Sequence, residues 1–324
     1  MDDLTTLMRD AVEDVEPTDR RPELREAVAV ASRRRFRKTL AGGLLAAAVV
    51  VTGVAVTINQ TDHDEPEPSG PPRAIDRSHD RRPAYALYYL GDTPQGDRLY
   101  REFRDGPGPQ TTPAAAISML QSEPDDPEYR SLWPAGTFSD AQVVGDVIQV
   151  EVADPAGVGD LPNGMSPADA ELSVDQVIFT VQGAIQQELP VQFTHDGSPL
   201  AQVLGVTTSE PLVAHEPVDV LALVSIGAPS ERRVVEDYFS ANGRASSFEG
   251  NVPWELWAPD GTVVRKGTAQ SFGWEDRLYP WATGRIDVSD LPPGDYTFVV
   301  STADPSGGTD HFVPTVDTRT VIIK

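Results

Sequence analysis

An uncharged segment near the start of the chain constrains its fold more than any other feature. No Asp, Glu, Lys or Arg occurs between Lys38 and Asp62, and residues 39–58 are mainly Ala, Val, Leu and Gly. A helix of about 20 residues rises about 30 Å, which matches the hydrocarbon core of a bilayer, and a helix satisfies its own backbone hydrogen bonds there. The sequence therefore predicts one transmembrane helix at residues 39–58.

The charges on either side of this segment predict its orientation. Five cations precede it, namely Arg33, Arg34, Arg35, Arg37 and Lys38, and an acidic stretch beginning at Asp62 follows it. The positive-inside rule places residues 1–38 in the cytoplasm and the C-terminal region outside the cell membrane, in a single-pass arrangement. The alternatives are a buried core helix and a cleaved signal peptide. Because 38 residues precede the apolar run and Gly53-Val54-Ala55 is a weak cleavage site, we expect an uncleaved anchor.

Charge and cysteine content exclude several kinds of partner and chemistry. The chain has 324 residues and a net charge of −24, and all of this excess lies after residue 60. An acidic surface repels nucleic acid, so we expect no nucleic-acid partner. The absence of cysteine excludes disulfides, thiolate metal sites and a cysteine nucleophile.

Two further segments flank the predicted membrane helix. An apolar stripe with helical spacing lies in the cytoplasmic segment 1–38 and consists of Leu4, Leu7, Met8, Ala11, Val12 and Val15. Such a stripe needs a partner, a bilayer surface or a second copy, and the segment loosely resembles the cytoplasmic parts of membrane-anchored bacterial regulators such as anti-sigma factors, without their zinc-binding His/Cys signature. Residues 59–82 are polar and rich in Pro, Asp and Arg, which predicts a disordered linker in which His63 and His79 are solvated.

Residues 83–208 mix strand and helix signals. We expect strands at 85–91, 97–105 and 190–197, helices at 114–121 and 173–189, and two short strands within 138–154 that meet at Gly145-Asp146. Pro113 favours the start of the first helix. This combination predicts one α+β domain.

The order of these elements resembles the GerM-type domain of bacterial sporulation and spore-germination proteins. The landmarks of that resemblance are Leu99, Glu102, Arg104, Ala115, Leu120, Pro134, Gly136, Thr137, Thr180, Asp196 and Gly197. Ser122-Glu123-Pro124 replaces the Gly-Pro that is usual after the first helix, and the helix that leads to Leu189 is less typical. The resemblance implies an α+β GerM-type domain outside the cell.

Residues 209–324 carry almost only strand signals separated by turns. The expected strands are 218–226, 233–245, 252–258, 262–270, 282–289, 296–304 and 318–324. Turns such as Pro259-Asp260-Gly261 supply glycine where a positive φ is needed. This pattern predicts an all-β sandwich.

The run at residues 241–264 resembles the immunoglobulin-like domain that accompanies GerM-type domains in bacterial envelope proteins. The residues that carry this resemblance are Gly243, Ala245, Phe248, Glu249, Val252, Asp260 and Gly261, and residues 291–308 add the late strand and turn of the family. The resemblance implies a link to spore germination for the pair of domains.

Few residues form a pattern that predicts catalysis. The sequence has no phosphate-binding Gly-rich loop and no Gly-x-Ser-x-Gly elbow. His195-Asp196 stands in an expected turn without an identifiable nucleophile. Acidic clusters occur at Asp125, Asp126 and Glu128 and at Asp304, Asp310 and His311, and a solvated loop explains each better than calcium or another metal. We therefore expect no enzyme activity, cofactor or metal.

Tryptophans in the last domain are the candidate contact residues. Trp257 is expected to point away from the core that holds Trp254 and Leu256, and Trp274 and Trp281 fall in an irregular stretch. Exposed aromatics suit contact with glycan or protein.

These observations predict a non-enzymatic, membrane-anchored envelope protein whose external domains bind a protein or a cell-wall component. The alternative is a transmembrane signalling regulator whose cytoplasmic helix binds a partner such as a sigma factor. A third possibility, an envelope hydrolase, requires a cleft with clustered acids or a Ser/His pair.

Overall fold

A long antiparallel ribbon begins the described part of the chain, which comprises residues 83–306 and 311–324 of this computed structural model. Strands β1 (Ala84–Thr93) and β2 (Gly96–Asp105) pair along their whole length. Tyr85, Leu87 and Tyr89 alternate along β1 and are buried, as the period of two in a strand requires. The strands predicted at 85–91 and 97–105 are confirmed, and both extend by one or two residues.

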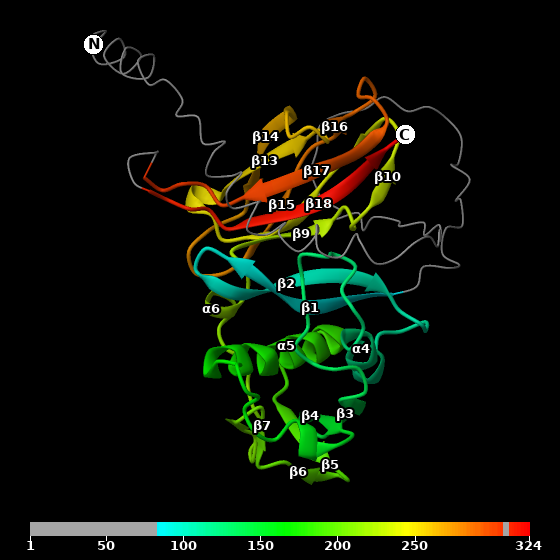
Figure 1. Cartoon of the computed structure of the whole chain (residues 1–324), viewed down its shortest axis with the longest axis vertical. Coiled ribbons are helices and arrows are strands. Elements are labelled where there is room, and N and C mark those ends of the chain that lie inside the picture. The colour runs from blue at the N-terminus through cyan, green and yellow to red at the C-terminus, as the bar shows by residue number, and fades with distance from the viewer. Residues whose placement is uncertain (1–82, 307–310) are drawn as a thin grey trace, which may run out of the picture.

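Two helices pack beneath the ribbon (Figure 1). Helix α4 (Pro113–Leu120) begins at Thr112, whose side chain accepts a hydrogen bond from the amide of Ala115. Helix α5 (Pro167–Ile185) begins at a capping box formed by Ser166 and Asp169. α5 therefore starts six residues before the position predicted from its apolar spacing, and it ends before Leu189 because Gln186 adopts a left-handed conformation with φ 55°.

A four-stranded sheet closes the other side of the helices. It contains β3 (Phe138–Val144), β4 (Val147–Val152), β5 (Val191–His195) and β6 (Ser198–Pro199), in that order. β4 and β5 are parallel, and α5 provides the crossover that parallel strands need. A short 3₁₀ turn η1 (Pro155–Gly157) follows β4, and the small pair β7 (Gln202–Val203) and β8 (Val206–Thr207) follows β6.

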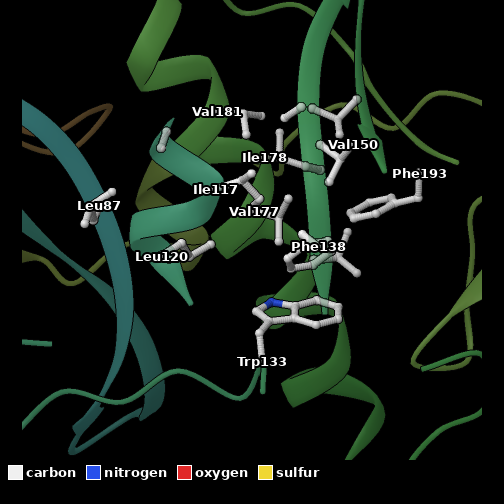
Figure 2. Packing of buried hydrophobic residues seen from close by; sticks show 14 of the residues in the cluster. Leu87, Ile117, Leu120, Trp133, Phe138, Val150, Val177, Ile178, Val181 and Phe193 are labelled. Carbon is white, nitrogen blue, oxygen red and sulfur yellow. The ribbon is translucent and has the colours of Figure 1, made fainter. Parts of the chain in front are cut away.

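Apolar side chains from the ribbon, the helices and the sheet form one core. Figure 2 shows Ile117 and Leu120 of α4 between Leu87 of β1 and Val177 of α5. On the other side of α5, Ile178 faces Val150 of β4. We call residues 83–222, which supply this core, the first unit.

The segment between residues 209 and 222 belongs to the first core. Leu212, Ala214 and Ala222 pack against that core, and the short helix α6 (Pro217–Val220) lies in the same segment. The sequence-based expectation assigns 209–222 to the all-β domain and predicts a strand from 218. Both expectations differ from the structure. The segment packs on the first core rather than the second. Residues 217–220 form a helical turn rather than a strand, and Val220 and Leu221 pack beside Leu99 of β2.

Residues 223–324, which we call the second unit, form mainly one curled sheet. Its eight strands run in the order β10-β18-β17-β13-β14-β15-β12-β9. The strand bounds are β9 (Val224–Ala228), β10 (Arg233–Val235), β12 (Asn242–Ala245), β13 (Asn251–Trp257), β14 (Val263–Ser271), β15 (Tyr279–Ala282), β17 (Gly294–Ser301) and β18 (Val316–Ile323). The pair β11 (Tyr238–Phe239) and β16 (Ile286–Asp287) and the 3₁₀ turn η2 (Phe248–Gly250) complete the unit.

The curled sheet modifies the predicted sandwich. β9 forms one edge of the sheet, yet it contacts β17 and β18 near the other edge because the sheet bends back on itself. A second core, with Leu256, Trp281 and Phe298 at its centre, fills the curl. The α+β class is confirmed for the described residues, whereas the second unit is one continuous sheet with a two-stranded addition rather than two packed sheets.

The predicted cytoplasmic segment 1–38, membrane helix 39–58 and linker 59–82 lie outside the described residues. Within residues 83–306 and 311–324, no helix is long and apolar enough to cross a membrane.

Candidate interaction surface

The loop between β14 and β15 exposes two aromatic side chains of the second unit. Phe272 is 79% exposed and Trp274 is 38% exposed. The half-buried Phe248 of η2 contacts Trp274 edge-on, with ring centroids 5.0 Å apart and planes at 77°. Exposed aromatic side chains suit contact with a partner. We call Phe272 and Trp274 the aromatic surface.

Hydrogen bonds fix the shape of this loop. The Ser271 hydroxyl lies 2.7 Å from the carbonyl oxygen of Gly273, and the amide of Glu275 donates to the Ser246 hydroxyl over 3.0 Å. Glu275 has a φ of 80°, which these contacts impose on a residue with a side chain. The exposure of Phe272 is therefore a property of an ordered loop.

Tyr279 anchors the far end of the loop. Its hydroxyl donates to Asp276 over 2.8 Å and lowers the pKa of that carboxyl group. The Arg277 guanidinium lies over the Tyr279 ring at 5.1 Å. The tyrosine ring also fills the space beside Gly273, where a Cβ atom would lie 2.6 Å from the ring. The aromatic surface is thus bordered by one acid and one base, both in contact with the same tyrosine.

The three tryptophans predicted as contact residues occupy different environments. Trp257 does point away from the main core, but it is buried with Val299 and Val316, and its indole nitrogen donates to Glu255 over 2.6 Å. Trp281 is 1% exposed in the core of the curled sheet. The expectation that Trp257 and Trp281 contact a ligand is therefore corrected, and Trp274 stays a prediction.

Phe272 was not predicted as a contact residue, although its position in the sequence indicates exposure. A phenylalanine between Ser271 and Gly273 lies in a turn-like context in which no core position is expected. The prediction named tryptophans as the contact residues, although tryptophan side chains are highly buried on average.

Hydrogen bonds within the first unit hold the loop through which this unit contacts the second. Glu102 of β2 accepts hydrogen bonds from the amides of Asp125 and Asp126 at 3.1 and 3.0 Å, and from Arg104 at 2.6 Å. Arg104 also donates to the Ser122 hydroxyl over 2.9 Å. These two residues, which are landmarks of the GerM-type resemblance, shape the loop that follows α4.

This loop binds β18 of the second unit through a buried charged cluster. Arg319 donates to Asp126 over 2.7 Å and to Asp317 over 2.9 Å, and the Tyr129 hydroxyl donates to Asp317 over 2.7 Å. The Thr318 hydroxyl donates to Glu128 over 2.9 Å. All six residues are buried. We call Asp126, Glu128, Tyr129, Asp317, Thr318 and Arg319 the interface cluster.

Burial sets the electrostatics of the interface cluster. Desolvation opposes the charge on Arg319, but Asp317, Tyr129 and Asp126 outweigh it and raise the pKa of the guanidinium well above its usual range. Desolvation raises the pKa of the Asp317 carboxyl, against the effect of Arg319. It also raises the pKa of the Tyr129 hydroxyl well above 10.0, so the tyrosine stays a donor.

The interface cluster corrects one sequence-based interpretation. Asp126 and Glu128 were expected in a solvated loop, but Asp126 is 0% exposed and contacts Arg319. No local pattern could reveal this contact, because the partners are 193 residues apart in the sequence.

Two of the three described histidines, His195 and His215, have partners other than a hydroxyl group. His195 contacts the backbone carbonyl of Val152 at 2.8 Å, and His215 contacts the Asp175 carboxylate at 2.7 Å. Catalysis by a serine or threonine needs a base within hydrogen-bond reach of the hydroxyl, and in residues 83–306 and 311–324 these two rings bond to a carbonyl and a carboxylate instead. Asp304 bonds to Ser306 in a turn, and Asp310 lies outside the described residues.

Comparison with known proteins gives a match for the second unit. A family model described as the immunoglobulin-like domain of bacterial spore germination matches residues 223–309. Among solved structures, the chain is similar to the tandem GerMN domains of the sporulation protein GerM from Bacillus subtilis, with 16% identity, 64% of this chain covered and a TM-score of 0.33. The chain spans 63% of that structure. No curated protein matches the sequence.

Proposed function

We propose that this chain is a non-enzymatic, single-pass protein of the bacterial cell envelope that binds a protein or a cell-wall component outside the membrane. The observation that carries this proposal is the ordered β14–β15 loop, which holds Phe272 and Trp274 in solvent. The surface lies in the unit that matches an immunoglobulin-like family of spore germination. The uncharged segment 39–58 with its cationic N-terminal flank supports the anchor and its orientation.

We further propose that the first unit is a GerM-type domain that acts together with the second unit. The interface cluster supports this proposal, because buried ion pairs and hydrogen bonds fix the first unit against β18. A ligand bound at the β14–β15 loop would therefore be held by a body of two units rather than by one domain on a flexible connection.

Loss of the exposed aromatics tests the binding surface. The full-length chain, purified in mild detergent, is mixed with purified cell-wall sacculi and sedimented. To trap a protein ligand in cells, a photoreactive amino acid is placed at the exposed position 277 of the same loop, in the wild type and in each variant. We expect Phe272→Ser combined with Trp274→Ser to reduce cosedimentation or crosslinking at least tenfold. The matched control is Val143→Ser with Val144→Ser, which removes exposed apolar area from the first unit and should leave binding unchanged. Equal binding by both double variants would refute the proposed surface.

The absence of cysteine makes the orientation directly testable. A single cysteine at the exposed position 209 (Ser209→Cys) should react with a membrane-impermeant maleimide in intact cells. A cysteine at position 5 (Thr5→Cys) should react only after the membrane is permeabilised. Labelling in the reverse order would overturn the proposed orientation.

The alternative function, a transmembrane signalling regulator, is favoured by the apolar stripe in residues 1–38. In that case the full-length chain should copurify with a cytoplasmic regulator such as a sigma factor, and Leu7→Glu combined with Val12→Glu should abolish this association. Retention of the partner by this variant would exclude the stripe as its contact.

A further inference from the structure

Three potential ligand side chains converge at the end of the molecule opposite the second unit. Glu151 lies on β4, His195 ends β5, and Asp196 follows it in the turn to β6. One ligand atom from each residue lies within 4.8 Å of the other two. Figure 1 places this end of β5 and β6 below the helices, far from the curled sheet.

The fold brings these residues together through strand register. β4 and β5 are parallel, with Glu151 opposite Thr194, so residue 151 lies beside the end of β5. The turn that follows has left-handed conformations at Asp196 (φ 49°) and Gly197 (φ 73°), which reverse the chain into β6. The Thr194 hydroxyl donates to Glu151 over 2.6 Å, and the Asp196 amide donates to the other carboxylate oxygen. The glutamate is therefore fixed in place.

Hydrogen bonding also fixes the tautomer of His195. Its Nδ1 atom lies 2.8 Å from the carbonyl oxygen of Val152, and a carbonyl oxygen only accepts. Nδ1 therefore carries the proton, and in the neutral ring the lone pair is on Nε2. An Nδ1–H bonded to a backbone carbonyl is the arrangement that orients metal-binding histidines.

The free lone pair of His195 faces a second acceptor. Its Nε2 atom lies 3.6 Å from Oδ2 of Asp196, too far for a hydrogen bond. Two ligand atoms on a tetrahedral ion with bonds of about 2.1 Å are about 3.4 Å apart, so the measured separation suits a shared cation. The Asp196 side chain is 93% exposed and that of His195 33% exposed, which leaves an open approach from solvent.

We propose that Glu151, His195 and Asp196 form a binding site for a borderline first-row divalent cation of the Zn²⁺ class. One imidazole nitrogen and two carboxylate oxygens favour such an ion over Mg²⁺ and Ca²⁺, which prefer oxygen ligands alone. Three protein ligands leave a coordination position for water or for a group on another molecule. The site is independent of the aromatic surface on the second unit.

Zinc titration of the full-length chain tests the site. The protein is stripped with a chelator and titrated with Zn²⁺ by calorimetry, with Mg²⁺ as the comparison ion. Asp196→Asn is the primary variant, because asparagine tolerates the left-handed conformation and removes only the charged ligand. His195→Gln is the second variant. The matched control is His215→Gln, which removes the other described histidine that contacts a carboxylate.

We expect Asp196→Asn and His195→Gln each to weaken Zn²⁺ binding at least tenfold, with His215→Gln unchanged. The melting temperature in chelator reports folding, and Asp196→Asn should match the wild type there because its side chain is exposed. Unchanged Zn²⁺ affinity in Asp196→Asn, loss of binding in His215→Gln instead, or equal affinity for Mg²⁺ would each overturn the proposal. None of these results would affect the proposed role of Phe272 and Trp274.

Discussion

Arg319 shows how one side chain can determine the relation between two folded units. It bonds to Asp126 of the first unit and to Asp317 on its own strand, and its Nη2 atom donates to the carbonyl of Ile226 over 3.1 Å. A buried charge is tolerated only when its partners replace water, and these contacts do so. The buried charges of Asp126 and Asp317 are in turn balanced by Arg319.

Replacement of Arg319 by methionine should therefore destabilise the protein strongly. Arg319→Met leaves two buried carboxylates without their cation, and breaking a buried pair in this way costs about 3–5 kcal/mol. Arg232→Met is the matched control, because Arg232 forms an exposed ion pair with Asp295 whose loss should cost less than about 1 kcal/mol. Urea unfolding measures both. Equal effects of the two substitutions would contradict the importance of the interface cluster.

His215 should make stability depend on pH. The hydrogen bond from its ring to Asp175 raises the pKa of His215, so the folded state binds the proton more tightly than the unfolded state. This contribution is complete below the unfolded pKa of about 6.5 and is lost as the pH rises through the raised folded value. The unfolding free energy should fall across that window in the wild type and in His311→Gln, and the fall should disappear in His215→Gln. A slope that persists in His215→Gln would assign it to another group. Burial also raises the pKa of the Asp175 carboxyl group.

Among the elements, α5 and the curled sheet show what sequence patterns can and cannot predict. The apolar period predicted the middle of α5 correctly, but five of the twelve buried residues of this helix are polar. One of them is Thr180, whose hydroxyl accepts a hydrogen bond from the amide of Tyr88 in β1. The observed start of α5 is set by the capping box of Ser166 and Asp169, which the apolar period does not reveal. In the second unit most strands were predicted, because alternation and glycine turns are local. The curl of the sheet and the interface cluster were not, because they depend on contacts between distant residues.

β12 has a close contact that a single methyl group should disrupt. A Cβ atom on Gly243 would lie 1.8 Å from the carbonyl oxygen of Ser225 in the neighbouring strand β9 and 2.9 Å from Trp281. Gly243→Ala should therefore force the strands apart and lower the unfolding free energy by about 1–3 kcal/mol or more. Gly284→Ala is the control, because a Cβ atom there meets nothing within 4 Å and should change stability by less than about 0.5 kcal/mol. Similar melting temperatures for the two variants would contradict this explanation.

At the scale of the whole molecule, the described units form layers from the curled sheet through the ribbon and helices to the four-stranded sheet (Figure 1). The ribbon is the middle layer, and the Tyr100 hydroxyl donates from it to the carbonyl of Val316 over 2.9 Å. The aromatic surface and the proposed cation site lie on different units. A molecule with this arrangement can hold two ligands at a fixed separation.

Hydrogen exchange should show whether the two units unfold together. Because β2 and β18 meet through Tyr100 and the interface cluster, their slowest amides should open with the same free energy in the wild type. In Arg319→Met the two values should separate, with β18 and the loop at 122–130 exchanging faster. Different opening free energies in the wild type would show that the units unfold independently.

The position of β18 along the chain has a consequence for biogenesis. This strand follows every other described strand, yet it lies inside the sheet between β10 and β17 and supplies half of the interface cluster. During synthesis, neither the curled sheet nor its junction with the first unit can be completed before residues 316–323 emerge. Until then the nascent polypeptide exposes an incomplete edge to chaperones and proteases, and premature termination upstream of β18 should yield a product that is degraded rather than accumulated.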